Sequence, residues 1–211
     1  MESHQKGNCL MVFLKEPVSG KVKTRLAESI GPDQACKAYL QMVDVLLNRL
    51  KSFPDIHLLI TDTGSGFDLS KWKLNPQWKT CAQSEGDLGF RMSSAFRDSF
   101  DQGYDKVLLI GSDCPEVGKS DLEMAFNKLE ESNLVLGPSR DGGYWLIGMN
   151  ALHQTVFKGI SWSTEIVLQQ TLKQAEKERL SCSLLRTLTD IDTVLEWREY
   201  EDKREKEYNH R

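Results

Sequence analysis

The sequence lacks the cysteine and histidine patterns that several large classes of protein require. Its 211 residues include five cysteines, and no two of them have Cys-x-x-Cys spacing. This excludes a zinc ribbon and gives no sign of a disulfide framework, as is typical of a protein from a reducing cytoplasm. The four histidines are scattered along the chain and fall in neither a metal-binding pattern nor a Ser/His/Asp arrangement.

Long apolar runs and an excess of positive charge are also missing. The longest early apolar run, residues 9–14, is too short for a signal-peptide core or a membrane span. The net charge of −4 gives no general attraction to nucleic acid or to an anionic membrane. We therefore expect a cytoplasmic protein with no nucleic-acid or membrane partner, and the sequence leaves its oligomeric state open.

Two well-known phosphate-binding loops are absent as well. A Walker A loop needs Gly-x-x-x-x-Gly-Lys-Ser/Thr, but Gly20-Lys21 is followed by Val22, and Lys15 stands five residues before Gly20. A dinucleotide-binding loop needs three spaced glycines after its strand, and this segment has one. A phosphate at this place would be held by side-chain cations more than by a glycine-rich backbone.

A cluster of cations does follow the first apolar run. Lys15, Lys21, Lys23 and Arg25 surround a turn that contains Gly20. Cations held on one loop repel each other unless an anion lies among them, and after the first strand of an α/β fold that anion is most often a nucleotide phosphate. The segment predicts a phosphate site made by these five residues. A solvated basic loop is the alternative.

Strand and helix patterns alternate along the rest of the chain. Apolar runs predict strands at residues 57–61, 78–81, 106–110, 133–136, 144–149 and 182–185. Helical periodicity and two capping boxes predict helices at residues 33–51, 86–100 and 163–177 and helix starts near 120 and 193. The alternation predicts a single-domain α/β sandwich with a mostly parallel central sheet. We expect this domain to span residues 9–211, after a flexible tail of residues 1–8.

Three aspartates follow predicted strands, where α/β folds bind their ligands. Asp113 comes directly after the run at residues 106–110, and Asp190 and Asp192 precede the last predicted helix. Carboxylates in such positions hold divalent cations that bridge phosphate oxygens. The alternatives are an Asx turn for Asp113 and a helix cap for Asp192.

A loop rich in glycine precedes the predicted strand at residues 144–149. Gly142 and Gly143 permit a ligand to approach the backbone closely, and Asp141 is placed to hold a substrate hydroxyl or to act as a base. An Asp-Gly turn is the alternative. Tyr144 and Trp162 are candidate acceptor contacts, with packing in the core as the alternative for both.

The predicted helix at residues 86–100 begins with Gly86 and Asp87. The positive end of its dipole is a candidate site for a nucleotide base or phosphate, with Asp87 among the contacts. The alternative for Asp87 is a purely structural role, in which its negative charge interacts favourably with the positive end of the helix dipole.

Taken in order, these segments resemble the bacterial GT-A-fold radical-SAM/selenodomain-associated glycosyltransferases, within the nucleotide-diphospho-sugar transferase superfamily. The similarity runs from about residue 10 to about residue 197. The motifs that carry it are Lys-Glu-Pro-Val-Ser-Gly-Lys-Val-Lys-Thr-Arg-Leu, Gly-Asp-Leu-Gly, Gly-Ser-Asp-Cys-Pro, Asp-Gly-Gly-Tyr, Trp-Ser-Thr and Asp-Ile-Asp-Thr. The first and last of them are also similar to phospholactate guanylyltransferases.

The resemblance implies a GT-A-like fold and a transferase that uses a nucleotide-sugar donor and a small-molecule acceptor. It implies Mg²⁺ or Mn²⁺ on Asp113, Asp190 and Asp192, and a basic loop that grips the phosphates. Together with the residue patterns, it gives Asp113, Asp141, Lys23 and Arg25 as the catalytic candidates. The alternatives are a nucleotidyltransferase that releases pyrophosphate from a nucleoside triphosphate and a non-catalytic nucleotide-binding protein. Several carboxylates near a phosphate site argue against the second of these.

Overall fold

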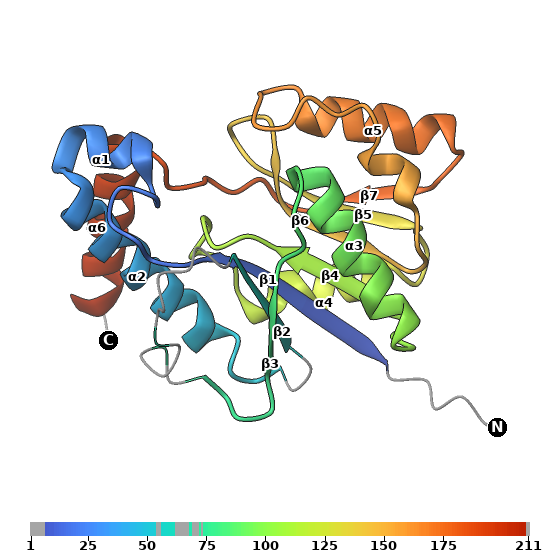
Figure 1. Ribbon diagram of the computed structural model, residues 1–211, viewed down its shortest axis with the longest axis horizontal. Helices are drawn as coiled ribbons and strands as arrows, with labels where there is room; N and C mark the ends of the chain where they lie inside the picture. The colour runs from blue at the N-terminus through green and yellow to red at the C-terminus, as the bar shows by residue number, and fades with distance from the viewer. Residues whose placement is uncertain (1–6, 54–55, 62–67, 69–71, 73, 210–211) are drawn as a thin grey trace.

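A computed structural model describes residues 7–53, 56–61, 68, 72 and 74–209, which form a seven-stranded sheet with helices on both faces (Figure 1). The strands lie in the order β3-β2-β1-β4-β6-β5-β7. Their bounds are β1 Asn8–Lys15, β2 Ile56–Thr61, β3 Lys79–Ala82, β4 Lys106–Ile110, β5 Leu134–Pro138, β6 Tyr144–Met149 and β7 Cys182–Leu184. The helices are α1 Thr24–Ile30, α2 Pro32–Arg49, α3 Leu88–Asp101, α4 Lys119–Lys128, the 3₁₀ helix η2 Gln154–Phe157, α5 Val167–Lys177 and α6 Val194–Asn209.

Strand direction confirms the predicted α/β fold with a mostly parallel sheet. Strands β3, β2, β1 and β4 pair in parallel, as do β5 and β7, whereas β6 is antiparallel to both of its neighbours. Because β6 runs against the others, its first residue, Tyr144, lies at the edge where β1 and β4 end. The loop between β5 and β6 therefore belongs to the edge at which such folds bind ligands.

The two faces of β1 show how the sheet is covered. Leu10, Val12 and Leu14 point into a core shared with α2, α4 and α6, and Cys9 and Met11 point into a core shared with α3, η2 and α5. Alternate side chains of a strand face opposite sides, so a strand covered on both sides reads as one apolar run. Figure 1 shows α1, α2 and α6 grouped at one side of the molecule and α3 and α5 at the other. Among the described residues, no helix has the length and apolar character needed to cross a membrane.

Several predicted boundaries shift by a few residues. Strand β1 begins at Asn8, which pairs with Lys106, so Asn8 lies in the sheet and not in the expected tail. Residues 1–6 of that tail lie outside the described residues. Helix α5 begins at Val167 and not at residue 163, because Ser163 has a φ of 65°, outside the range of a right-handed helix.

The capping box predicted at residues 120–123 is wrong in register. Helix α4 begins at Lys119, and the Asp121 carboxylate accepts a hydrogen bond of 2.9 Å from the backbone N–H of Gly118. Arg186 fixes this carboxylate with two hydrogen bonds, of 2.6 and 2.8 Å. The paired guanidinium places Asp121 at the helix start, a tertiary contact that the local sequence does not reveal.

The capping box predicted at residue 193 is present in part. A carboxylate oxygen of Glu196 accepts hydrogen bonds of 2.7 Å from the backbone N–H groups of Asp192 and Thr193. Helix α6 begins at Val194, directly after Thr193, and Glu196 in its first turn holds the backbone of Asp192 and Thr193 in place.

Candidate active site

The loops that the sequence singled out meet at the carboxyl edge of the sheet. The backbone N–H of Ile191 donates a hydrogen bond of 2.9 Å to the carbonyl of Asp113, and the N–H of Arg140 donates one of 3.0 Å to the carbonyl of Leu188. These two bonds tie the segment before α6 to the loop after β4 and to the β5–β6 loop. Asp113 and Asp192 therefore lie close together at the same edge of the sheet, as predicted.

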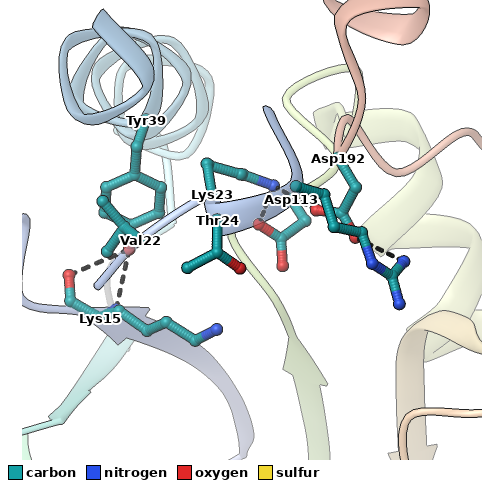
Figure 2. Close-up of a pocket in the computed structure, with 8 residues that line it drawn as sticks. Lys15, Val22, Lys23, Thr24, Tyr39, Asp113 and Asp192 are labelled. Atoms are coloured by element: carbon teal, nitrogen blue, oxygen red, sulfur yellow. Dashed lines mark hydrogen bonds and ion pairs between the residues drawn. The ribbon is translucent and has the colours of Figure 1, made fainter. Parts of the chain in front are cut away.

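Two neighbouring pockets open at this edge. The smaller pocket has a volume of about 140 Å³ and is lined by Lys15, Val22, Lys23, Thr24, Arg25, Tyr39, Asp113 and Asp192 (Figure 2). The larger pocket has a volume of about 580 Å³ and shares Lys15, Arg25, Asp113 and Asp192 with it. A small, charged chamber thus adjoins a space large enough for most of a nucleotide or sugar.

Lys23 lines the smaller pocket and lies between its two aspartates. Its ammonium group contacts a carboxylate oxygen of Asp113 and lies 3.0 Å from Asp192 Oδ1. Figure 2 shows the side chain reaching between the two aspartates. The side chain is 3% exposed, and the residue has a φ of 48° at the start of α1. A left-handed conformation costs a residue with a Cβ about 1–2 kcal/mol, which the two ion pairs offset.

The charges in this cluster shift each other's ionisation. Burial alone would lower the pKa of Lys23, but the two carboxylates outweigh it and raise that pKa well above its usual value. Burial alone would raise the pKa of Asp113, but the Lys23 ammonium holds it below its usual value. The Lys23 ammonium group and the Asp113 carboxylate therefore each favour the charged form of the other. The Arg25 guanidinium, 3.8 Å from Asp192 Oδ2, adds a second cation on the solvent side.

Tyr39 of α2 fixes the end of β1 beside these charges. Its hydroxyl accepts a hydrogen bond of 2.8 Å from the backbone N–H of Lys15 and donates one of 3.0 Å to the carbonyl of the same residue. Burial raises the pKa of Tyr39 to about 12, so the hydroxyl stays protonated. The helical pattern of residues 33–51 gives no sign of this contact, which depends on how α2 packs against β1 in the folded protein.

Asp190 faces a different partner from Asp113 and Asp192. The Cys114 thiol donates a hydrogen bond of 2.5 Å to Asp190 Oδ1. Among the described residues, no group of three or more histidine, cysteine, aspartate or glutamate side chains is arranged to hold a metal ion. Two of the three predicted ligands nevertheless converge on one point, because Asp113 and Asp192 contact the same ammonium group. Their oxygens are donors that Mg²⁺ and Mn²⁺ accept.

Asp190 gives a prediction about stability and pH. Burial raises the pKa of Asp190 to about 7, and the Asp141, Asp113 and Asp192 carboxylates add to this against the opposing effect of the Cys114 thiol. The folded state therefore holds a proton that the unfolded state loses near pH 4. This contribution to stability is complete below pH 4 and is lost between pH 4 and pH 7, with a limiting slope of about 1.4 kcal/mol per pH unit.

The unfolding free energy of Asp190→Asn should therefore lack this loss. Relative to the wild type, the variant is expected to become more stable as the pH rises from 4 to 8. Asparagine keeps the oxygen that accepts from Cys114 and cannot ionise. The measurement is urea unfolding of both proteins between pH 4 and pH 8 in buffer with a chelator. A difference in unfolding free energy that does not change with pH would contradict the raised pKa.

The β5–β6 loop forms the Asp-Gly turn that was the alternative interpretation of this segment. Asp141 Oδ1 accepts a hydrogen bond of 3.0 Å from the Gly143 N–H and another from the Ser139 hydroxyl. Gly142 has a φ of +85°, and a Cβ there would lie 1.9 Å from the carbonyl oxygen of Glu165. Asp141, Gly143 and Tyr144 nevertheless line the larger pocket. The turn therefore shapes one wall of the site as well as the backbone.

Trp162 lies in another wall of the larger pocket. A Cβ on Gly89 of α3 would lie 2.6 Å from its indole nitrogen, and its ring centroid lies 6.5 Å from that of Phe157. The indole is therefore packed partly on the core and partly exposed to the pocket. The predicted contact of Trp162 with an acceptor remains a prediction.

Several predicted contacts lie outside both pockets, among the residues that the structure describes: Gly20, Lys21, Asp87 and Gly142. Asp87 caps α3, and its carboxylate accepts a hydrogen bond of 2.8 Å from the Phe90 N–H. Lys21 is exposed, and its backbone N–H donates to the carbonyl of Val18. The predicted roles of Gly20, Lys21 and Asp87 in nucleotide or phosphate binding, and of Gly142 in acceptor binding, remain predictions.

The larger pocket also has lining residues that the sequence did not single out. Gln83 follows β3, and its amide nitrogen donates hydrogen bonds of 3.0 and 2.9 Å to the carbonyls of Leu14 and Leu59. Arg91 of α3 donates one of 2.8 Å to the carbonyl of Gly86. Gln83 could have been predicted as a site residue, because it follows the predicted strand at residues 78–81. Apolar side chains complete the wall: Phe13, Leu14, Leu88, Met92, Leu109, Ile147 and Val167.

The fold is that of the nucleotide-diphospho-sugar transferases. A candidate nucleotide-diphospho-sugar transferase of Desulfovibrio desulfuricans superposes with a TM-score of 0.82 at 37% identity, over 89% of this chain and 83% of that one. The chain belongs to the family described as "Uncharacterized protein conserved in bacteria (DUF2064)", whose model matches residues 46–164. No curated protein matches the sequence.

More distant structures share the fold alone. One is the 4-diphosphocytidyl-2C-methyl-D-erythritol synthase of Anaerococcus prevotii, with a TM-score of 0.58 at 11% identity over 90% of this chain and 95% of that one. Another is the inositol-1-phosphate CTP transferase of T. maritima, with a TM-score of 0.53 at 16% identity over 91% and 92% of the two chains.

Proposed function

We propose that this protein is a metal-dependent transferase that moves a group from a nucleotide-sugar donor to a small-molecule acceptor. The observation that carries the proposal is the convergence of Asp113 and Asp192 beside Lys15, Lys23 and Arg25, at the mouth of a pocket of about 580 Å³. Carboxylates and cations in one small chamber suit a phosphate group and its counter-ion. The name of the Desulfovibrio relative is consistent with this donor class.

The chain's own residues would divide the work by their charge. Asp113 and Asp192 would hold Mg²⁺ or Mn²⁺, which when bound neutralises phosphate charge as a Lewis acid. Lys15 and Arg25, both exposed at the pocket, would stabilise negative charge on the leaving phosphate. The acceptor would lie against Asp141 and Trp162, and Asp141 would accept a proton from the hydroxyl group of the acceptor.

A nucleotidyltransferase that releases pyrophosphate is the second candidate. The three cations that line the smaller pocket favour it, because a triphosphate carries more negative charge than a diphosphate. The two activities differ in their products. The purified protein would be incubated with each nucleoside triphosphate and each nucleotide-sugar, with a panel of hydroxylated acceptors and Mn²⁺. Release of a nucleoside diphosphate from a nucleotide-sugar supports the first function, and release of pyrophosphate from a triphosphate supports the second. If neither product forms, both functions are contradicted.

The exposed cation Arg25 gives a direct test of phosphate binding. Arg25→Ala is expected to weaken binding of a nucleoside diphosphate by about 1–2 kcal/mol and to leave binding of the free nucleoside nearly unchanged, because it removes a charge-assisted hydrogen bond. Calorimetric titration with both ligands measures the difference. Lys37→Ala is the matched control, since Lys37 is an exposed cation on α2 outside both pockets. Equal losses for both ligands in Arg25→Ala would show that Arg25 supports the loop and not the phosphate.

A further inference from the structure

We propose that Lys23 is a resident counter-ion that keeps a divalent cation off the Asp113–Asp192 pair until the phosphates of a nucleotide draw its ammonium group away. The inference rests on the proposed function, since it concerns the order in which the metal and the nucleotide bind. It assigns Lys23 a role that a phosphate-binding lysine alone does not have.

The first observation is the position of the ammonium group. Lys23 Nζ contacts Asp113 and Asp192 together, so it stands where oxygens from both aspartates converge. The two carboxylates are 41% and 37% exposed, whereas the Lys23 side chain is 3% exposed. The aspartates are thus open to solutes from the pocket, and the point between them is taken by a group of the protein itself (Figure 2).

The second observation is the charge of the cluster. Its two carboxylates, Asp113 and Asp192, share the buried Lys23 ammonium group, and the exposed Arg25 guanidinium lies 3.8 Å from the outer oxygen of Asp192. A divalent cation would match both carboxylates, but it would then lie within a few ångström of the ammonium group, where like charges repel strongly. The two cations therefore compete for the same oxygens, and the tethered one has the advantage when no other anion is present.

The third observation is that two further cations in the same chamber can attract a phosphate group. Lys15 and Arg25 line the same chamber and carry no ion pair as close as those of Lys23 in the described part of the chain. A phosphate attracted by them would bring new oxygen acceptors within reach of Lys23, whose side chain is long and flexible.

Binding of Mn²⁺ to the protein without nucleotide tests this competition. The readout is the electron paramagnetic resonance signal of free Mn²⁺, in titrations of the wild type, Lys23→Met and Lys37→Met. Lys37→Met loses one exposed positive charge outside the pockets and controls for net charge. Lys23→Met is expected to bind Mn²⁺ at least about tenfold more tightly than the other two proteins, because the competing cation is gone. Equal affinity in all three proteins would overturn the proposal.

A second measurement keeps the test valid if Lys23→Met is too unstable to titrate. Lys23→Gln keeps much of the side chain's length without its charge, and the rise in Tm with Mn²⁺ should be larger for this variant than for the wild type. If Mn²⁺ raises the Tm of the wild type as much, or stabilises no Lys23 variant, the competition does not exist. If Mn²⁺ also fails to strengthen diphosphate binding by the wild type, the metal dependence in the proposed function fails as well. If Mn²⁺ strengthens diphosphate binding by the wild type but the Lys23 variants bind Mn²⁺ no more tightly than the wild type, the proposed function stands and the proposed role of Lys23 is wrong.

Discussion

Asp113→Asn is expected to weaken metal-dependent binding of a nucleoside diphosphate by about 100-fold, equal to about 2.7 kcal/mol. Asparagine keeps the shape of the side chain and removes the negative charge that a hard cation needs. Asp192 would still pair with Lys23, and the Asp113 side chain is 41% exposed, so water already shares its solvation. The fold should therefore persist, with a Tm only a few degrees lower.

Calorimetric titration of the diphosphate with and without Mn²⁺ measures this effect. Asp98→Asn is the matched control, because Asp98 is an exposed aspartate of α3 outside both pockets. In Asp113→Asn, Mn²⁺ should no longer strengthen nucleotide binding, whereas in the control it should do so as in the wild type. Unchanged strengthening by Mn²⁺ in Asp113→Asn would make Asp113 a turn residue and not a ligand.

Gly142→Ala is expected to destabilise the protein by about 3 kcal/mol or more. The residue has a φ of +85°, and the added Cβ would lie 1.9 Å from the Glu165 carbonyl oxygen, a backbone atom that no side-chain rotation can move. The Gly142 carbonyl also accepts a hydrogen bond of 2.9 Å from the Leu168 N–H at the start of α5. The substitution would therefore separate the β5–β6 turn from α5, in addition to the strain at Gly142 itself.

Gly20→Ala separates these two costs. Gly20 has a φ of +79°, but a Cβ there would meet no atom within 4 Å, so only the backbone strain of about 1–2 kcal/mol remains. Urea unfolding of both variants gives the comparison. Similar losses for the two variants would mean that the segment around Glu165 yields easily and that the turn is not fixed by its contact with α5.

The parts of the fold that depend on local pattern could be predicted from the sequence. The run at residues 106–110 is apolar without interruption because β4 is covered on both faces, and its bounds match the structure. Asp113 and Asp192 were predicted to share one edge of the sheet, and the Ile191–Asp113 hydrogen bond places them there. Strand order and the antiparallel direction of β6 depend on long-range pairing, which no single segment encodes.

The parts that could not be predicted depend on residues far apart in the chain. Lys23 and Asp192 are separated by 169 positions, so nothing in the basic loop shows that one of its four cations is buried between carboxylates. The register of α4 depends on Arg186, and the Asp190–Cys114 contact depends on the packing of two loops. In each case the side chain contacts a partner that is distant in the sequence and complementary in charge or hydrogen bonding. The local sequence shows only that the side chain could instead face solvent or cap a turn.

The most direct test of the account is the Tm of the wild-type protein with a nucleoside, its diphosphate and its triphosphate, each with and without Mn²⁺. At 100 times the dissociation constant, a ligand that binds only the folded state adds about 2.7 kcal/mol, which for a domain of this size is about 5–10 °C. We expect a shift of this size for at least one base when phosphates and Mn²⁺ are both present, and little or none with the nucleoside alone. A Tm that no nucleotide changes, or that a nucleoside raises as much as its diphosphate, would contradict a site built for phosphate and metal.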